Sequence, residues 1–257
     1  MTLKWRVAWI TGASTGIGRE LALKLSAEGV KVAASARSAD KLDELAKASG
    51  LITVFPLDVA DLDATRRCVD AIEQRLGPID LAVLNAGTWA PMTADRFDAT
   101  VIAGTTAVNY QGVVNAVDAL LPRMTARQAG HIAMVASVAG YRGLPRSAAY
   151  GPTKAALINL AETLACELPT RGLAVSVINP GFVDTPMTSV NKFPMPFKIS
   201  AAAAADHIIR GLGKQKFEIA FPWQLVSVLK LARLLPYPLF FWFVRNVIAR
   251  EPAKKPG

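Results

Sequence analysis

Hydrophobic and polar positions follow two patterns that take turns along the chain. Apolar runs of four to seven residues, bounded by glycine, proline or polar residues, are typical of strands buried on both faces of a sheet. Segments of ten residues or more, with apolar positions at the helical period, lie between these runs. The predicted strands are 7–10, 30–36, 51–57, 79–84, 131–136, 173–179 and 217–222.

Predicted helices separate these strands, and the two kinds of element together indicate a fold class. The helices are expected at 19–28, 40–49, 61–76, 101–121, 154–164 and 201–211. Regular alternation of strand and helix predicts right-handed crossovers and a parallel sheet with helices on both faces. We therefore expect one α/β domain over residues 1–222, a three-layer Rossmann-type doubly wound parallel sheet of about seven strands.

A glycine-rich turn joins the first predicted strand to the first predicted helix. It reads Thr11-Gly-Ala-Ser-Thr-Gly-Ile-Gly18. Small residues let the backbone approach a phosphate, and a helix N-terminus presents unpaired N–H groups and the positive end of its dipole. This context favours a nucleotide phosphate site over a tight structural turn, and its expected members are Gly12, Ser14, Thr15, Gly16, Ile17 and Gly18.

The end of the second predicted strand bears on which cofactor is bound. Dinucleotide folds that use NAD place an acidic residue here for the ribose hydroxyl, and a nearby arginine accommodates the extra phosphate of NADP. Ala36 fills this position, and Arg37 and Ser38 follow it. A missing carboxylate and an added cation favour NADP, while the alternative is a solvated surface arginine.

Tyr150 and Lys154 lie four residues apart in a predicted helix, so their side chains share one face. A cation beside a phenol favours the phenolate and lowers its pKa, which suits proton transfer to or from an alcohol or carbonyl oxygen. Ser137 follows the fifth predicted strand and should face this helix. A tyrosine–lysine pair at this spacing also arises by chance, so it needs support from other motifs.

Other candidate residues follow predicted strands at the edge where open α/β sheets bind ligands. Asn109 lies in the middle of a long predicted helix and has poor helix propensity, and on its own it indicates no function. The residues at the strand ends are Asp58 and Val59, then Asn85, Ala86 and Gly87, and finally Pro180, Gly181, Val183 and Thr185.

In this order and spacing, the motifs resemble the short-chain dehydrogenase/reductase family over residues 5–221. The resemblance implies that Tyr150 exchanges a proton with the substrate oxygen, and that Lys154 binds the nicotinamide ribose and lowers the Tyr150 pKa. It implies that Ser137 hydrogen-bonds the substrate carbonyl, and that Asn109 holds a water linking Lys154 to solvent. The other implied contacts are with adenine for Asp58-Val59, behind the cofactor for Asn85-Ala86-Gly87, and with the nicotinamide amide for the segment from Pro180 to Thr185.

Composition limits the remaining classes of function. The two cysteines and two histidines are isolated, so neither a disulfide framework nor a transition-metal site is expected. We see no signal peptide and expect a reducing, cytoplasmic location, with a peripheral place on the inner face of a membrane as an extension of it. The net charge of +9 is uneven, because residues 1–186 carry +1 and residues 187–257 carry +8.

The last quarter of the chain is both apolar and basic. Residues 182–200 form an expected substrate loop whose Met187, Phe193, Met195 and Phe197 suit a hydrophobic substrate, with ordinary packing as the alternative. Residues 223–257 are expected to form a helical hairpin, broken near Pro236 and too short in either half to span a membrane. Contact with an anionic membrane through 223–255, an oligomer interface and a pocket lid all remain open, and nucleic acid is disfavoured because large aliphatics interrupt the cations.

The sequence therefore predicts an NADP-dependent oxidoreductase that interconverts a carbonyl and a secondary alcohol, with an apolar, lipid- or steroid-like ketone as substrate. The alternative is an NADP-binding sensor or scaffold of the same fold without turnover. A homodimer or homotetramer is expected. The segment between Tyr150 and Lys154 departs from the family pattern through Pro152, which the first turn of a helix tolerates.

Overall fold

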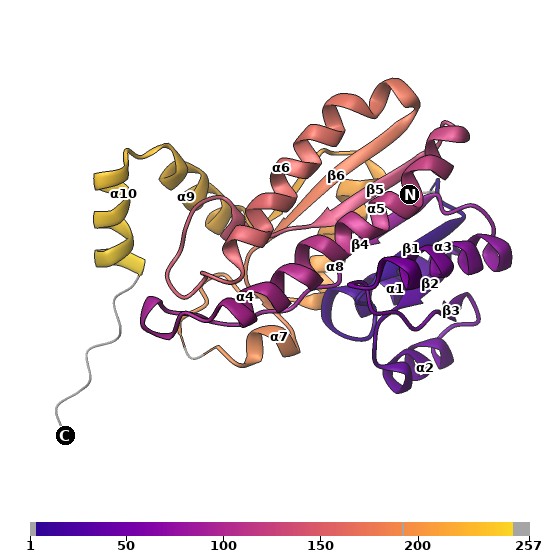
Figure 1. Ribbon diagram of the computed structural model, residues 1–257, viewed down its shortest axis with the longest axis horizontal. Coiled ribbons are helices and arrows are strands. Elements are labelled where there is room, and N and C mark those ends of the chain that lie inside the picture. Colours follow the sequence, from indigo (N-terminus) through magenta and orange to yellow (C-terminus); the bar gives the residue numbers. More distant parts are fainter. Residues whose placement is uncertain (1–3, 192, 249–257) are drawn as a thin grey trace.

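A seven-stranded parallel sheet forms the centre of the molecule, with strand order β3-β2-β1-β4-β5-β6-β9 (Figure 1). The computed structural model of the protein describes residues 4–191 and 193–248. The predicted doubly wound α/β fold is confirmed. The strands are β1 Val7–Thr11, β2 Lys31–Ser35, β3 Ile52–Val54, β4 Leu81–Leu84, β5 Gly130–Val135, β6 Leu173–Pro180 and β9 Glu218–Phe221.

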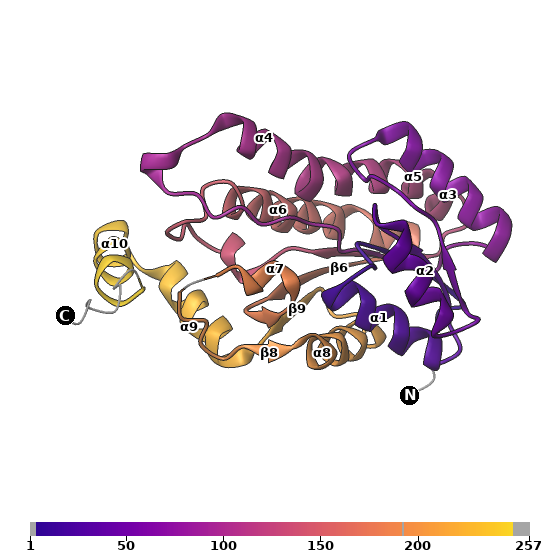
Figure 2. The ribbon, with the colours of Figure 1, turned by 90° about the horizontal axis from the view of Figure 1, so that it is seen from below.

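Helices cover both faces of this sheet (Figure 2). Residues of one face pack with α1 Gly16–Ala27, α2 Ala39–Lys47 and α8 Ala201–Gly213. Residues of the other face pack with α3 Leu62–Leu76, α5 Gly112–Ala126 and α6 Gly151–Glu167. Strand β1 shows why, since successive side chains of a strand point to opposite faces and all five of its residues are buried.

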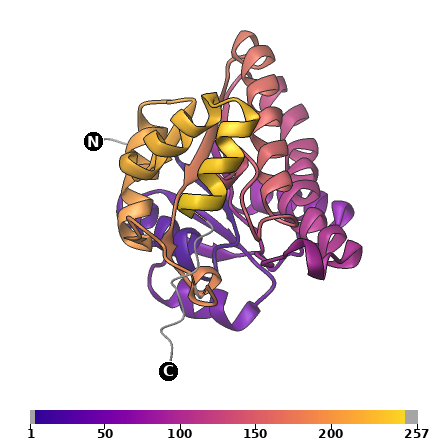
Figure 3. The same cartoon turned by 90° about the vertical axis from the view of Figure 1, so that its left-hand side faces the viewer.

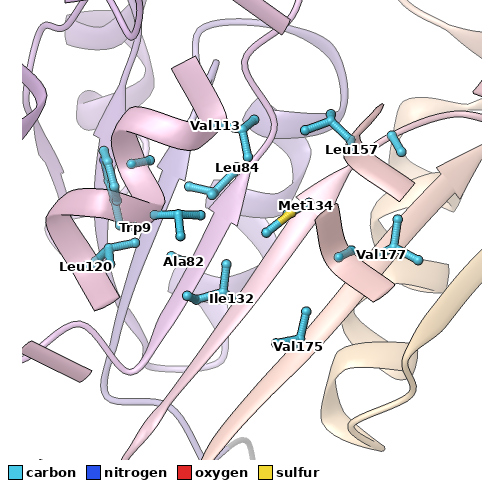
Figure 4. Close-up of a cluster of buried hydrophobic side chains, with 14 of the residues drawn as sticks. Trp9, Ala82, Leu84, Val113, Leu120, Ile132, Met134, Leu157, Val175 and Val177 are labelled. Atoms are coloured by element: carbon cyan, nitrogen blue, oxygen red, sulfur yellow. The ribbon is translucent and has the colours of Figure 1, made fainter. Parts of the chain in front are cut away.

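The cluster on the α3–α5–α6 side is the larger of the two cores (Figure 4). Trp9, Leu84 and Met134 point from the strands towards Leu120 and Leu157 of the covering helices. Each of these side chains is almost fully buried. Burial of one large apolar side chain contributes about 1.5–3 kcal/mol to folding, so this layer holds the strand ends, and the residues that follow them, in fixed positions.

The long helix predicted at 101–121 differs most from the structure. It is longer and divided into α4 Ala99–Thr106, a π-helical turn η2 Ala107–Gln111, and α5. Periodicity predicts a continuous helix because a single π-helical turn adds only one residue to the pattern. Strand 51–57 is shorter than predicted at three residues, although Phe55 and Leu57 still donate backbone hydrogen bonds to Ala34 and Ala36.

Several short elements connect these layers. They are η1 Ala94–Arg96, η3 Val138–Gly140, η4 Pro169–Arg171, β7 Val183–Asp184, α7 Pro186–Ser189 and β8 Ile199–Ser200. Strands β7 and β8 pair in parallel and close the two ends of the predicted substrate loop against each other. The loop therefore leaves β6 and returns before α8 as one connected excursion over the carboxyl edge of the sheet.

The chain continues after β9 in two helices, α9 Trp223–Leu234 and α10 Tyr237–Phe243, and a π-helical turn, η5 Val244–Ile248. Pro236 lies at the break between them, as the sequence predicts. Val226 and Leu229 of α9 pack into the larger core, so α9 is joined to the main domain. Within residues 4–191 and 193–248, no helix has the length and apolar character needed to cross a bilayer.

Candidate active site

A cleft of about 270 Å³ lies at the carboxyl ends of the strands. Nearly all of the residues singled out from the sequence line it. Gly18 and Asn109 lie outside its wall. The predicted residues that line the cleft are Gly12, Ser14, Thr15, Gly16, Ile17, Arg37, Ser38, Asp58, Val59, Asn85, Ala86, Gly87, Ser137, Tyr150, Lys154, Pro180, Gly181, Val183 and Thr185.

The glycine-rich turn packs too tightly for side chains at its key positions. Gly12 and Gly16 have φ angles of +67° and +55°, which other residues rarely adopt. A Cβ on Gly18 would lie 2.4 Å from the Gly12 carbonyl oxygen. The Asn85 side chain donates to the carbonyls of Thr11 (3.0 Å) and Gly12 (3.2 Å), so β4 holds the turn in place. Gly18 therefore allows the close packing of the turn, although it does not itself line the cleft.

The N-terminus of α1 faces this cleft. Thr15 is the N-cap residue of α1, its side chain makes no capping hydrogen bond, and the first turn of the helix contains no acidic residue. The first backbone N–H groups of a helix have no intrahelical acceptor, and the helix dipole adds positive potential there. This end of α1 can therefore bind an anionic group such as a pyrophosphate.

Arg37 and Ser38 form the rim of the cleft beyond β2. Both residues are exposed, and both border the cavity. Ser38 stands at the N-cap position of α2, where its side chain makes no capping hydrogen bond. A guanidinium, a hydroxyl and a helix N-terminus therefore meet at the end of β2, a combination suited to a phosphate ester.

Asp58 and Val59 border the cleft from the loop after β3. The Asn115 side chain of α5 donates to the carbonyls of Val59 (2.9 Å) and Ala60 (3.3 Å) and so fixes this loop. Asn115 is 2% exposed. Sequence reasoning missed it, because a buried polar residue inside a helix cannot be told from a surface one until its partner is known.

Ser137, Tyr150 and Lys154 come together at the end of β5. The Ser137 hydroxyl donates to the Pro180 carbonyl (3.3 Å), which ties it to the end of β6. Tyr150 occupies the N-cap position of α6, so Pro152 falls in the first turn, as expected. The Lys154 ammonium lies 5.4 Å from the centroid of the Tyr150 ring and donates to the Val135 carbonyl at 2.8 Å.

The acidities of these groups depend mainly on burial. Burial raises the pKa of the Tyr150 phenol to about 12, and a hydrogen bond between the Ser137 and Tyr150 side chains offsets part of this rise. Burial also lowers the pKa of Lys154 to about 7. The spacing predicts a lowered Tyr150 pKa, whereas in this structure burial raises it. A phenol with this pKa stays protonated at neutral pH.

Asn109 lies in the π-helical turn η2 and is fully buried. Its side-chain oxygen accepts from the Thr88 N–H (2.7 Å), and its amide nitrogen donates to the Thr88 carbonyl (3.0 Å) and the Thr153 hydroxyl (3.2 Å). The side chain thereby links the helix to α6 and to the loop after Gly87. Its implied role of holding a water stays a prediction.

Trp89 is a further residue that the sequence analysis missed. Its ring meets the Tyr150 ring edge to face, with centroids 5.1 Å apart. Its indole nitrogen donates to the Asn191 side chain at 2.9 Å, which joins the loop after β4 to the substrate loop. Phe193 of the same loop packs against Phe182. The only sequence signal was an aromatic residue two positions after Gly87.

Fold and cleft together define an α/β protein of the class that binds a dinucleotide at the carboxyl edge of its sheet. The protein-family model for short chain dehydrogenase matches residues 6–193. An uncharacterized oxidoreductase of Myxococcus xanthus is 40% identical over 243 residues, which cover 93% of this chain and 96% of the relative. A 3-oxoacyl-(acyl-carrier-protein) reductase of Thermotoga maritima is 35% identical over 197 residues, covering 73% and 78% respectively.

Solved structures give the same result. A short-chain dehydrogenase from Streptomyces avermitilis superposes with a TM-score of 0.78 at 25% sequence identity, covering 88% of this chain and 92% of that one. The chain belongs to the short-chain dehydrogenase family. It is therefore an oxidoreductase that acts between alcohol and carbonyl groups with a nicotinamide cofactor, NAD or NADP.

Proposed function

We propose that this protein is an NADP-dependent reductase that converts an apolar ketone into a secondary alcohol. The observation that carries the proposal is the group of Ser137, Tyr150 and Lys154 in the cleft that the glycine-rich turn also borders. The reductase from Thermotoga maritima, 35% identical, supports reduction as the direction.

The residues of the chain divide the chemistry among them. When bound, the nicotinamide cofactor supplies the hydride. Ser137 offers its hydroxyl to the substrate carbonyl, and Tyr150 donates its phenolic proton to the oxygen that becomes the alcohol. Lys154 lies one turn along α6, where a positive charge stabilises the phenolate left by that transfer. Trp89 packs edge to face against the Tyr150 ring and so helps to hold it in position.

The same cleft offers a separate site for each part of the cofactor. The α1 N-terminus and the glycine-rich turn suit the pyrophosphate. The rim formed by Arg37 and Ser38 suits an additional phosphate on the adenosine ribose, and Ala36 leaves no carboxylate to repel it. Asp58 and Val59 suit the adenine side. These residues therefore fit NADP better than NAD.

Substitution of Arg37 tests the cofactor preference. Arg37→Asp should weaken NADPH binding by roughly tenfold or more, because a charge-assisted pair is replaced by like-charge repulsion. NADH binding should change much less. Fluorescence titration with both cofactors measures the two dissociation constants. Arg75→Asp, the same change at an exposed position of α3, is the control. An unchanged ratio of the two constants would remove Arg37 from this role.

Substitution of Trp89 tests the shape of the substrate site. Trp89→Ala should raise KM for a compact apolar ketone several-fold and allow bulkier ketones to react, because it removes the ring that packs against Tyr150. Trp89→Phe keeps an aromatic edge but loses the hydrogen bond to Asn191, so it separates packing from loop attachment. Steady-state kinetics on ketones of graded size measure the effect. Identical substrate profiles for all three proteins would place the substrate elsewhere.

The overall proposal is tested by NADPH oxidation in the presence of a panel of apolar ketones. We expect turnover with at least some of them and faster reaction with NADPH than with NADH. Tight NADPH binding without turnover on any ketone would favour the alternative, a cofactor-binding sensor or scaffold.

The proposal also covers the oligomeric state and the cellular location of the protein. Members of this family are commonly oligomeric, and we propose a homodimer or homotetramer, which light scattering measures. We also propose a cytoplasmic location. Cys68 and Cys166 are both free thiols, and Cys166 is exposed. An exposed free thiol fits a compartment that keeps thiols reduced.

A further inference from the structure

Helices α9 and α10 carry an unusual concentration of exposed apolar side chains. Of the fifteen large hydrophobic residues that are exposed in the described chain, eight lie between positions 223 and 242. Leu234 is 80% exposed, Tyr237 68% and Trp242 62%. We call these eight residues the hairpin surface: Trp223, Val228, Leu231, Leu234, Tyr237, Leu239, Phe241 and Trp242. Exposed apolar groups gathered in this way mark a surface that meets an apolar partner.

The hairpin surface is held rigidly on the main domain. Val226 and Leu229 anchor α9 in the larger core. Arg142, from the segment between Ser137 and Tyr150, packs its guanidinium 4.0 Å from the centroid of the Phe240 ring. The same guanidinium donates to three carbonyls at the end of α9, those of Ala232 (2.8 Å), Arg233 (3.0 Å) and Leu235 (2.7 Å). The side of the hairpin that faces the main domain is therefore occupied. The eight side chains of the hairpin surface stay exposed, although the Arg142 guanidinium also lies 4.9 Å from the centroid of the Tyr237 ring.

The charged residues near the hairpin surface indicate what kind of partner covers it. Residues 219–250 contain four cations, Lys230, Arg233, Arg245 and Arg250, and no acidic residue. Lys230 pairs with Glu218, which lies just before this stretch. Arg233 and Arg245 are exposed. The partner should therefore combine an apolar interior with negative charge at its edge.

A second copy of the chain fits these requirements poorly. A two-fold contact sets the same patch against itself, so the cations of one hairpin would meet those of the other with no carboxylate from 219–250 to pair them. An anionic bilayer offers acyl chains to the apolar residues and headgroups to the arginines. Tryptophan and tyrosine are also the side chains that favour the boundary between acyl chains and water.

We propose that the hairpin surface docks this protein on an anionic lipid surface, with α9 and α10 lying in the membrane interface. Figure 3 looks onto the end of the molecule where α9 and α10 lie. Helix α9 also adjoins the active-site cleft. Leu225 of α9 packs so close to Gly181, which lines the cleft, that a Cβ on that glycine would lie 2.7 Å from it. Docking therefore brings the cleft region near the lipid, where apolar ketones accumulate. This consequence for substrate supply rests on the proposed function, whereas docking itself does not.

Flotation of the full-length protein with lipid vesicles tests the proposal. The probes are vesicles of equal parts phosphatidylglycerol and phosphatidylcholine, and vesicles of phosphatidylcholine alone. We expect flotation with the anionic vesicles at low salt, and much weaker flotation at high salt or with the neutral vesicles. Absence of flotation with anionic vesicles at low salt would overturn the proposal.

A pair of charge substitutions locates the contact. Leu234→Glu with Trp242→Glu should lower the fraction bound by roughly tenfold or more, because both side chains leave the apolar phase and add negative charge. Both positions are exposed, so the fold and ketone reduction in solution should be retained. The control, Leu51→Glu with Phe217→Glu, adds the same charge at exposed apolar positions outside the hairpin and should float like the original protein.

Light scattering on the same variants separates the competing partner. Loss of oligomer mass in Leu234→Glu with Trp242→Glu, without loss of flotation, would show that the hairpin surface joins two copies and would overturn the proposal. Equal flotation of the variant and the original protein would do the same. The docking measurement needs no substrate, so failure to reduce any ketone would defeat the proposed function and leave docking intact.

Discussion

Tyr150→Phe should lower kcat/KM for ketone reduction by about 10²–10⁴-fold, the range typical of a lost general acid. The substitution removes one oxygen atom and keeps the ring that packs against Trp89. Burial raises the pKa of Tyr150 to about 12, so at neutral pH the phenol is protonated and carries the proton that the product alcohol needs. Phenylalanine has no proton to give, while the hydride donor and the substrate pocket stay in place.

Steady-state kinetics together with cofactor titration measure this effect. NADPH affinity should change little, because the phosphate and adenine sides of the cleft lie away from the phenol. Tyr237→Phe provides the matched control, since it removes the hydroxyl of an exposed tyrosine in α10. If Tyr150→Phe retained the original rate, the proton would have to come from another group, and the role of Tyr150 would be lost.

Lys154→Met should abolish most turnover and also stabilise the protein at low pH. Lys154 is 3% exposed, and burial lowers its pKa to about 7. The difference from an ordinary lysine corresponds to a cost of about 5 kcal/mol for burying the charge. Methionine avoids that cost but leaves the Val135 carbonyl without its donor, a loss of about 1–3 kcal/mol. The net gain at pH 6 is expected to be about 2–4 kcal/mol.

The stabilising effect of Lys154→Met depends on pH. Below about pH 7 the amine is charged in both the folded and the unfolded chain, so the full cost of burial is present. As the pH rises towards the ordinary lysine pKa of about 10.4, the unfolded chain holds the extra proton and the original protein gains stability. The advantage of Lys154→Met should therefore disappear by about pH 10.

Urea unfolding at pH 6 and pH 10 measures both values. Lys47→Met is the control, because Lys47 is exposed and its replacement should leave the free energy of unfolding nearly unchanged at either pH. A Lys154→Met protein that is less stable than the original at pH 6 would contradict this prediction. It would show that contacts other than the bond to Val135 compensate the cost of burying the ammonium.

Much of the fold could be predicted because its signals are local. Strands buried on both faces produce continuous apolar runs, and covering helices repeat at the helical period, so the alternation appears directly in the order of residues. The glycine-rich turn is equally local, since Gly12 and Gly16 need backbone angles that other residues avoid. Strand lengths and the division of the long helix could not be predicted, because one extra residue in η2 barely changes the pattern.

The features of the candidate site also divide into those with a local signal in the sequence and those without one. Sequence by itself determined the family, the residues that follow each strand and the four-residue spacing of Tyr150 and Lys154. Tertiary structure decided the direction of the Tyr150 pKa, because burial depends on every element packed around the phenol. It also decided that Trp89 donates a hydrogen bond to Asn191 and that Arg142 caps the end of α9. These contacts join residues about a hundred positions apart, and their energies depend on distances and solvent exclusion that no local pattern records.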